Sequence, residues 1–323
     1  MQDTVVVTAQ VRSARKSPLL WGAVLFSASM VAAPAQTLEP DATEAAARVA
    51  LAVLGIAATP NETLSSLSVV STSGDNSSFR STQLRGGFNL LDSPLYLEGL
   101  IAYQRYNPTF IFPGVSPDVE LDVTWESVAG TVGVGWDFPL GGDWRLRPIG
   151  HLSLGQVATD ADVVGRPPMP LGMRAAQAVD GTLNSYGVGA SLALVRDATF
   201  GKWEGEYRLR QTYLEFPPLN EPQAGDAKAS SNQTTLFARH RYPLEGFRPL
   251  DLPSNLILDA GVVFYRGDGE AVLQTNWVAT AGIGLELETE ESSLLGGLAG
   301  RVMLSGVVSQ EFDGLSIGFG LRF

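Results

Sequence analysis

Residues Gly314–Phe323 read GLSIGFGLRF and end on an aromatic side chain. Along this stretch, apolar residues alternate with small or polar ones. One set contains Leu315, Ile317, Phe319, Leu321 and Phe323, and the other contains Gly314, Ser316, Gly318, Gly320 and Arg322. Because successive side chains of a strand point to opposite faces, the pattern predicts a strand with one apolar face. Small and charged residues behind that face suit a strand with lipid outside and a crowded polar interior.

The same alternation recurs from Asn61 to the end of the chain. It predicts an all-β fold, a transmembrane antiparallel up-and-down β-barrel of about 12 strands, preceded by a short N-terminal α-helix in or under the lumen. The expected strands are approximately residues 63–72, 77–91, 95–107, 121–138, 144–159, 183–196, 202–216, 232–243, 255–266, 272–287, 295–310 and 314–323. In 272–287 we expect Leu273, Thr275 and Trp277 on the outward face.

The connections between these segments alternate between short and long. Counting back from a periplasmic C-terminus, the longest irregular stretches, 109–120, 160–182 and 217–231, all fall on the outer side. A soluble β-sandwich would alternate too, but it would not gather aromatic side chains at one end of the strands. That girdle consists of Trp136, Phe138, Trp144, Phe200, Trp203 and Tyr242, and it favours the membrane barrel.

Composition narrows the possible functions. The 323 residues include 35 glycines and no cysteine, and 17% of them are charged. Without cysteine there is no disulfide, thiol nucleophile or thiolate metal site. The net charge of −12 argues against a nucleic-acid partner. With only two histidines we predict no metal site and no cofactor, and we interpret the acidic residues near Asp118 and Asp160 as solvated loops.

The N-terminal residues 1–35 are predicted to be a signal peptide. Basic residues precede an apolar run from Leu19 to Ala33, and small residues follow, with cleavage expected after Ala35. Residues 3–9, DTVVVTA, resemble the energy-coupling box of TonB-dependent receptors, but they lie before the signal. Coincidence or a mis-called start, with residues 1–10 outside the true protein, is the favoured explanation.

Residues 36–60 form the predicted helix segment, and residues 61–323 form the barrel. Between Thr43 and Ala58 only Glu44 and Arg48 are charged, so the helix requires burial on almost every side. Either it packs at the periplasmic mouth of the barrel or it lies in the lumen.

Many charged residues share the faces opposite to the apolar ones. Because a lipid-facing arginine at the bilayer midplane costs about 2–4 kcal/mol, these residues are expected to point into the lumen and pair across strands. A structural ion-pair network is favoured over a substrate path. The predicted network contains Glu98, Arg145, Arg147, Glu204, Glu206, Arg208, Arg210, Arg239, Arg241, Arg301 and Arg322.

His151 and Ser153 are a candidate catalytic pair. Residues two apart on a strand share a face, and outer-membrane lipid hydrolases use a His-x-Ser pair of this kind. Those enzymes place the pair toward lipid, whereas this pair shares a face with Arg145 and Arg147. No third member is apparent nearby, so we predict no catalytic residue. His240 is interpreted as an interfacial residue.

The complete pattern resembles the translocator domain of autotransporters, and more closely the solitary autotransporter-type barrels that have no passenger. The only local motif is the terminal one, in which Ser316, Gly318, Leu321 and Phe323 resemble the C-terminal assembly signal of outer-membrane barrels. The resemblance implies a helix in the pore that joins the first strand from the periplasmic side. It also implies the β-barrel assembly and secretion machineries as partners during biogenesis. The asparagine-containing scission site of self-cleaving members is missing from residues 43–58.

These observations predict a Gram-negative cell outer membrane protein that contacts membrane lipid and lipopolysaccharide and is a monomer. The expected function is non-enzymatic, through surface loops or as a helix-plugged pore. The alternatives are a small-solute channel of the porin kind and a lipid hydrolase using His151 and Ser153.

Overall fold

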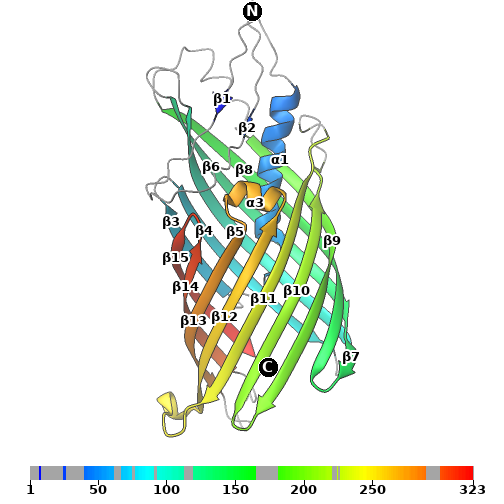
Figure 1. Cartoon of the computed structure of the whole chain (residues 1–323), viewed down its shortest axis with the longest axis vertical. Helices are drawn as coiled ribbons and strands as arrows, with labels where there is room; N and C mark the ends of the chain where they lie inside the picture. The colour runs from blue at the N-terminus through cyan, green and yellow to red at the C-terminus, as the bar shows by residue number, and fades with distance from the viewer. Residues whose placement is uncertain are drawn as a thin grey trace, which may run out of the picture.

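The computed structural model describes residues 7–8, 25–26, 40–61, 67–74, 77–90, 93–112, 119–164, 181–219, 224, 226–288 and 299–322. Within these residues, twelve long antiparallel strands form a barrel (Figure 1). They are β3 (Leu67–Gly74), β4 (Ser77–Asn89), β5 (Leu95–Phe112), β6 (Val119–Trp136), β8 (Trp144–Val164), β9 (Gly181–Phe200), β10 (Trp203–Phe216), β11 (Ala229–Pro243), β12 (Ser254–Arg266), β13 (Trp277–Glu288), β14 (Ala299–Ser309) and β15 (Asp313–Arg322).

Each strand pairs with its neighbour in the sequence, and the ends of the sheet meet. The terminal strand β15 pairs with β3, from Asp313 opposite Ser73 to Phe319 opposite Leu67. The short strand β7 (Phe138–Gly141) follows β6 and also pairs with β8. Because no long edge strand remains within the described sheet, its backbone groups are paired, as a barrel in lipid requires. The predicted fold class and the strand number are confirmed.

The two faces of the strands have different compositions. In β6, Val128, Val132 and Val134 are more than half exposed, whereas Ser127 and Thr131 are buried. The predicted alternation therefore holds, with apolar side chains outside and small or polar side chains inside. In a soluble protein such an apolar outer wall would be unfavourable, but it matches the hydrocarbon of a bilayer.

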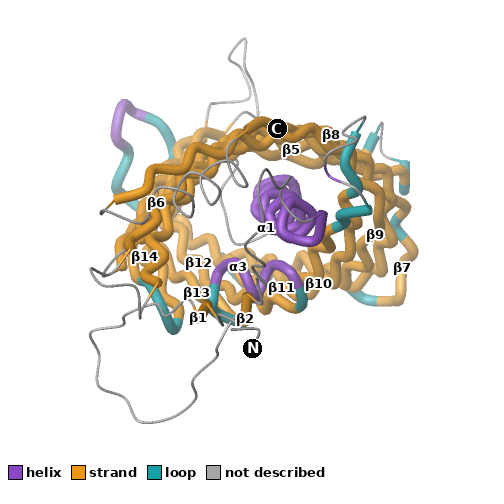
Figure 2. The backbone as a smooth tube through the Cα atoms, turned by 90° about the horizontal axis from the view of Figure 1, so that it is seen from above, coloured by secondary structure: helices purple, strands orange, loops and turns teal. Residues whose placement is uncertain are grey.

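Helix α1 (Pro40–Ala58) lies inside the ring of strands (Figure 2). It packs against β5, β6, β8, β9, β10 and β11, and against the short helix α3 (Asp268–Leu273). Of the two positions expected for this helix, the periplasmic mouth and the lumen, the structure shows the lumen. No helix among the described residues is long and apolar enough to cross a membrane.

The two ends of the barrel differ. The end that carries α3, the N-terminus of α1 and the finishing residues of β5 and β8 is called the loop end below (Figure 1). The opposite end carries the tight connection from β9 to β10 and the 3₁₀ turn η2 (Pro249–Asp251), and is called the turn end. Helix α1 starts at the loop end and finishes well inside the barrel.

Several boundaries differ from the prediction. Strand β8 ends at Val164 and strand β9 begins at Gly181, so the loop expected at 160–182 is shorter. Strand β13 begins at Trp277 rather than at 272, because α3 occupies the start of that segment. Leu273 and Thr275 are consequently buried rather than outward-facing, so that prediction was wrong. Alternation alone cannot distinguish a strand from a short helical turn.

Other predicted segments lie outside the described residues. Of the predicted signal peptide, the structure describes only β1 (Val7–Thr8) and β2 (Leu25–Phe26). These two short strands pair with each other. Residues 62–66 and Phe323 are also outside the described part.

Candidate functional site in the barrel lumen

The second half of α1 is completely enclosed by the barrel. Leu51, Val53, Leu54 and Ala57 have no exposed surface. Leu54 belongs to a buried cluster formed with inward-facing residues of the strands, including Ala129, Val157, Leu214 and Phe216. Full burial of one leucine side chain contributes about 1.5–3 kcal/mol, so a helix with several such residues is firmly docked.

Glycines allow the helix to approach the barrel wall closely. A Cβ atom on Gly155 of β8 would lie 2.6 Å from Leu54 Cδ1, which is too close for a real contact. A Cβ atom on Gly55 of the helix would lie 3.3 Å from the ring of Phe216. At these two positions the helix and the wall are therefore too close to accommodate a larger residue without a shift of the neighbouring side chain.

Hydrogen bonds hold the inner end of α1. Thr131 Oγ1 on β6 donates to the carbonyl oxygen of Ala58 at 2.6 Å. Thr59 Oγ1 hydrogen-bonds to Ser231 Oγ on β11 at 2.7 Å. The first bond satisfies a carbonyl at the helix C-terminus that lacks a partner within the helix, and the second joins the residue after the helix to the wall.

The outer part of α1 is held by an ion pair at the loop end. Arg48 Nε and Nη2 lie 2.9 and 2.8 Å from Asp268 Oδ1 at the start of α3. The other carboxylate oxygen of Asp268 accepts hydrogen bonds from the backbone N–H and the hydroxyl of Ser230. The Arg48 side chain is 62% exposed, so this pair contributes little compared with the apolar contacts.

Nearer the turn end, charged side chains form the ion-pair network. The innermost pair joins Arg210 of β10 to Glu98 of β5, with Nη2 2.6 Å from Oε1 and Nη1 3.1 Å from Oε2. Their side chains are only 1% and 7% exposed. Strands β6, β8 and β9 lie between β5 and β10 in the sheet. The pair therefore spans the interior of the barrel rather than bridging neighbouring strands.

A second part of the network connects β10 to β14. Arg241 Nε lies 2.7 Å from Glu286 Oε1, and Arg241 also pairs with Glu204. Arg301 Nη1 reaches Glu286 Oε2 at 3.6 Å. Glu286 has no exposed side-chain surface, and two guanidinium groups compensate its burial.

A third part gathers at the turn end. Arg147 Nε and Nη2 bind both oxygens of Asp137 at 2.5 and 2.8 Å, and its guanidinium lies over the ring of Tyr96. Asp197 accepts from both Arg145 and Arg208. The bidentate and shared pairs fix these side chains in one arrangement.

The structure brings together ten of the eleven predicted network residues, each with an oppositely charged partner. The side chain of Arg322 lies outside the described residues. The prediction omitted Asp137, Asp197, Asp259 and Glu286, which are four of the seven acidic partners in the described ion pairs of the network. Asp259 and Glu286 lie on inward faces by alternation and could have been included. Asp137 and Asp197 lie where strands end, so their direction depends on the turns.

His151 and Ser153 do not form a catalytic pair in this structure. His151 and Ser153 are both buried and inward-facing, but Ser153 Oγ hydrogen-bonds to Thr131 Oγ1 at 2.7 Å. His151 Nε2 lies 2.7 Å from Ser191 Oγ and 3.1 Å from Arg210 Nη2. Because a guanidinium only donates, Nε2 acts as an acceptor for Arg210, and the imidazole is part of the network.

The remaining predicted residues are placed as follows. His240 stacks on Trp203 with ring centroids 4.7 Å apart and hydrogen-bonds to Tyr207 and Tyr242.

Ser316 is buried on the inward face of β15. Gly318 shares that face, and the side chains of Leu321 and Phe323 lie outside the described residues. Among the residues that the structure describes, no group of three or more histidine or acidic side chains is arranged to bind a metal.

Residues 48–162, from within α1 to near the end of β8, match the family model described as autotransporter β-domain. The match covers 115 of the 323 residues, so over this part the barrel is similar to autotransporter β-domains. The fold is that of an outer-membrane β-barrel. No curated protein sequence matches it.

Solved structures resemble this barrel at low sequence identity. The transport unit of AIDA-I from Escherichia coli is 12% identical, covers 89% of this chain and 99% of its own, and gives a TM-score of 0.48. The β-domain of BrkA from Bordetella is 13% identical over 80% of this chain and 96% of its own, with a TM-score of 0.45. The NanC porin is 11% identical over 80% of this chain and 100% of its own, with a TM-score of 0.37.

Proposed function

We propose that this protein is a non-enzymatic pore of the outer membrane that α1 holds closed. The observation that supports the proposal is the seating of the helix. Its inner half lies in the lumen and carries fully buried apolar side chains, among them Leu51, Val53 and Leu54. A solute that crosses the barrel on this side would have to displace the helix.

The ion-pair network is a second barrier in series with the helix. Arg210 and Glu98 cross the interior toward the turn end, and the guanidinium of Arg241 is held between acidic groups of β10 and β13. Paired charges of this kind narrow the lumen without giving it a net attraction for ions of one sign. The network therefore supports a closed resting state rather than an open small-solute channel.

A hydrolase is less well supported by the same residues. Ser153 is engaged by Thr131, and His151 is engaged by Ser191 and Arg210. A serine nucleophile needs a base within hydrogen-bonding reach and a path for the substrate. No hydrogen bond joins His151 to Ser153 among the described contacts, and both side chains are buried.

The test is planar-bilayer conductance of the full chain and of a variant that lacks residues 40–58. We expect the full chain to be closed most of the time and the deletion to raise the mean conductance at least about tenfold, because removing α1 empties the loop-end half of the lumen. Arg48→Ala is the matched control, since it removes the exposed ion pair and keeps the buried contacts. Equal conductance in the full chain and the deletion would contradict the plug.

Thiol labelling separates the plug from the network. The chain has no cysteine, so Ala129→Cys places a single thiol on the wall beneath α1. A water-soluble maleimide should label this thiol slowly in the full chain and rapidly in the helix deletion. If the deletion labels rapidly but does not conduct, the ion-pair network closes the pore and α1 does not.

A further inference from the structure

Helix α1 is not centred in the lumen. It packs against β5, β6 and β8 to β11, and Figure 2 shows it nearer to that side of the ring. A cavity of about 60 Å³ remains beside Ile56 and Asn61, between the helix and the wall formed by β4, β5 and β12 to β14. This cavity, called the side cavity below, lies away from the ion-pair network.

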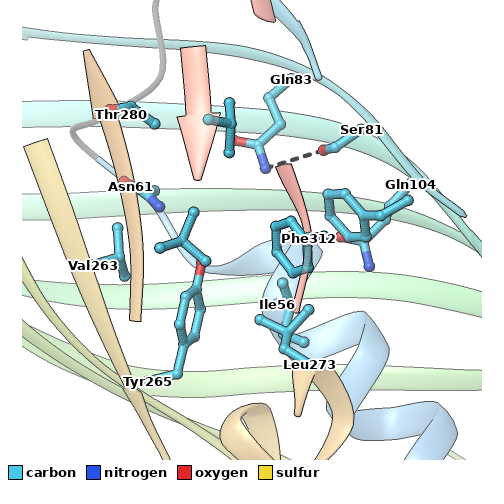
Figure 3. A pocket seen from close by; sticks show the side chains of 13 residues that line it. Ile56, Asn61, Ser81, Gln83, Gln104, Val263, Tyr265, Leu273, Thr280 and Phe312 are labelled. Atoms are coloured by element: carbon cyan, nitrogen blue, oxygen red, sulfur yellow. Dashed lines mark hydrogen bonds between the residues drawn. The ribbon is translucent and has the colours of Figure 1, made fainter. Parts of the chain in front are cut away.

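The side cavity has two chemically different ends (Figure 3). Deeper in the barrel it is lined by Ser81, Gln83, Gln104 and Thr280. Toward the loop end it is lined by apolar and aromatic side chains, including Phe312 and Leu273. No charged side chain is among the described residues that line it.

Gln104 is the most informative of these residues. It is 1% exposed, and neither its amide nitrogen nor its amide oxygen has a hydrogen-bond partner among the described residues. Gln83 Oε1 is unpartnered too, although its Nε2 reaches Ser81 Oγ at 3.4 Å. A buried amide without partners is destabilising, so an amide in this position that faces a cavity indicates an occupant with hydrogen-bonding groups.

We propose that the side cavity binds a small uncharged solute that both donates and accepts hydrogen bonds, of the primary amide or urea class. One water needs about 10–15 Å³, so the cavity holds about four to six non-hydrogen atoms. The Gln104 amide pairs with the amide of the solute, and the aromatic end covers its apolar part. A charged solute is excluded because no side chain among the described lining residues compensates a charge. The site is separate from the proposed plug function of α1.

Fluoroacetamide is a suitable probe because it has five non-hydrogen atoms and a fluorine nucleus. With so few atoms the Kd is expected to be on the order of 1 mM, which ligand-observed ¹⁹F relaxation detects. The folded full chain should broaden the ¹⁹F line of fluoroacetamide. Fluoroacetate, which has the same size but carries a negative charge, should be broadened much less.

Gln104→Leu should weaken the binding of fluoroacetamide about tenfold, since the amide pairing is lost. Gln233→Leu is the matched control, because Gln233 is also buried, also has an unpartnered Oε1, and does not line the cavity. It should leave the affinity within about twofold, as expected for a distant site.

Circular dichroism and heat-modifiable gel mobility verify folding of each variant. If Gln104→Leu does not fold, Val307→Leu replaces it, since a larger side chain at this lining position should reduce binding. Broadening that is absent in the wild type, unchanged in the tested variant, or equal for fluoroacetate and fluoroacetamide would overturn the proposal. The first of these results would mean that the side cavity holds water only.

Discussion

The loop-end and turn-end halves of the lumen are closed by different chemistry. In the loop-end half, apolar side chains of α1 pack against small and apolar side chains of the wall. In the turn-end half, arginine and acidic side chains pair directly between strands. The first half is closed by a separate element that has its own surface. The second is closed by the strands themselves.

This difference has a consequence for stability. When an apolar side chain is truncated, the loss of stability grows roughly with the area and volume removed. Each truncation in α1 should therefore weaken the docking of the helix by a limited amount. Buried ion pairs respond differently, because removing one partner leaves an uncompensated charge in a poorly hydrated interior. We therefore expect mutations of the network to affect the whole barrel and mutations of α1 to affect mainly the docking of the helix.

The largest effect is expected for Arg210→Ala. This change leaves Glu98 buried without its bidentate partner, and losses of this kind cost about 3–5 kcal/mol. The free energy of unfolding, measured by urea titration in lipid vesicles, should fall by that amount. A double variant with Glu98→Leu and Arg210→Met, which removes both charges, should recover most of the loss.

Arg248→Ala serves as the control for this prediction, because Arg248 lies on an exposed turn. It should change the free energy of unfolding by less than about 0.5 kcal/mol. If Arg210→Ala were as mild as Arg248→Ala, the two halves of the lumen would not differ in the way described.

A smaller effect, confined to the plug, is expected for Leu54→Ala. Truncation of a fully buried leucine costs about 2–5 kcal/mol, here in the docking equilibrium of α1. With a thiol introduced at position 129, the labelling rate should rise by a factor of about 30 to 4000, because about 1.4 kcal/mol corresponds to tenfold. The urea unfolding of the strands should change much less.

The lipid-facing Leu209→Ala is the matched control for Leu54→Ala, since it removes the same atoms from the outer wall. It should leave the labelling rate of the thiol at position 129 unchanged. Equal rates in Leu54→Ala and Leu209→Ala would show that Leu54 does not hold the helix.

The smallest effect is expected for Arg48→Ala. Its ion pair with Asp268 is largely exposed, so the loss should be at most about 1 kcal/mol. The labelling rate of the thiol at position 129 should rise by less than about fivefold, and added salt should reproduce part of the change in the wild type. A rise as large as that of Leu54→Ala would show that the main contact holding α1 lies at the loop end.

Alternation predicted most of the barrel because side-chain direction is fixed by the strand itself. It also placed charges such as Arg210 and Arg241 on the inward face. It could not predict that Arg210 reaches Glu98 across three intervening strands, since such a contact depends on the curvature of the closed sheet. Likewise, it could not predict the partner of His151, because Ser153 is near in sequence whereas Ser191 is near in space.

The sequence by itself determined the membrane barrel, its inward charges and a helix that needed burial, because each of these follows from the local period and composition of the chain. Tertiary structure alone decided which charges pair, how α1 sits off-centre, and where the side cavity remains. The physical reason is that closing the sheet sets distances between residues far apart in the chain, and neither ion pairs nor packing contacts form until those distances exist.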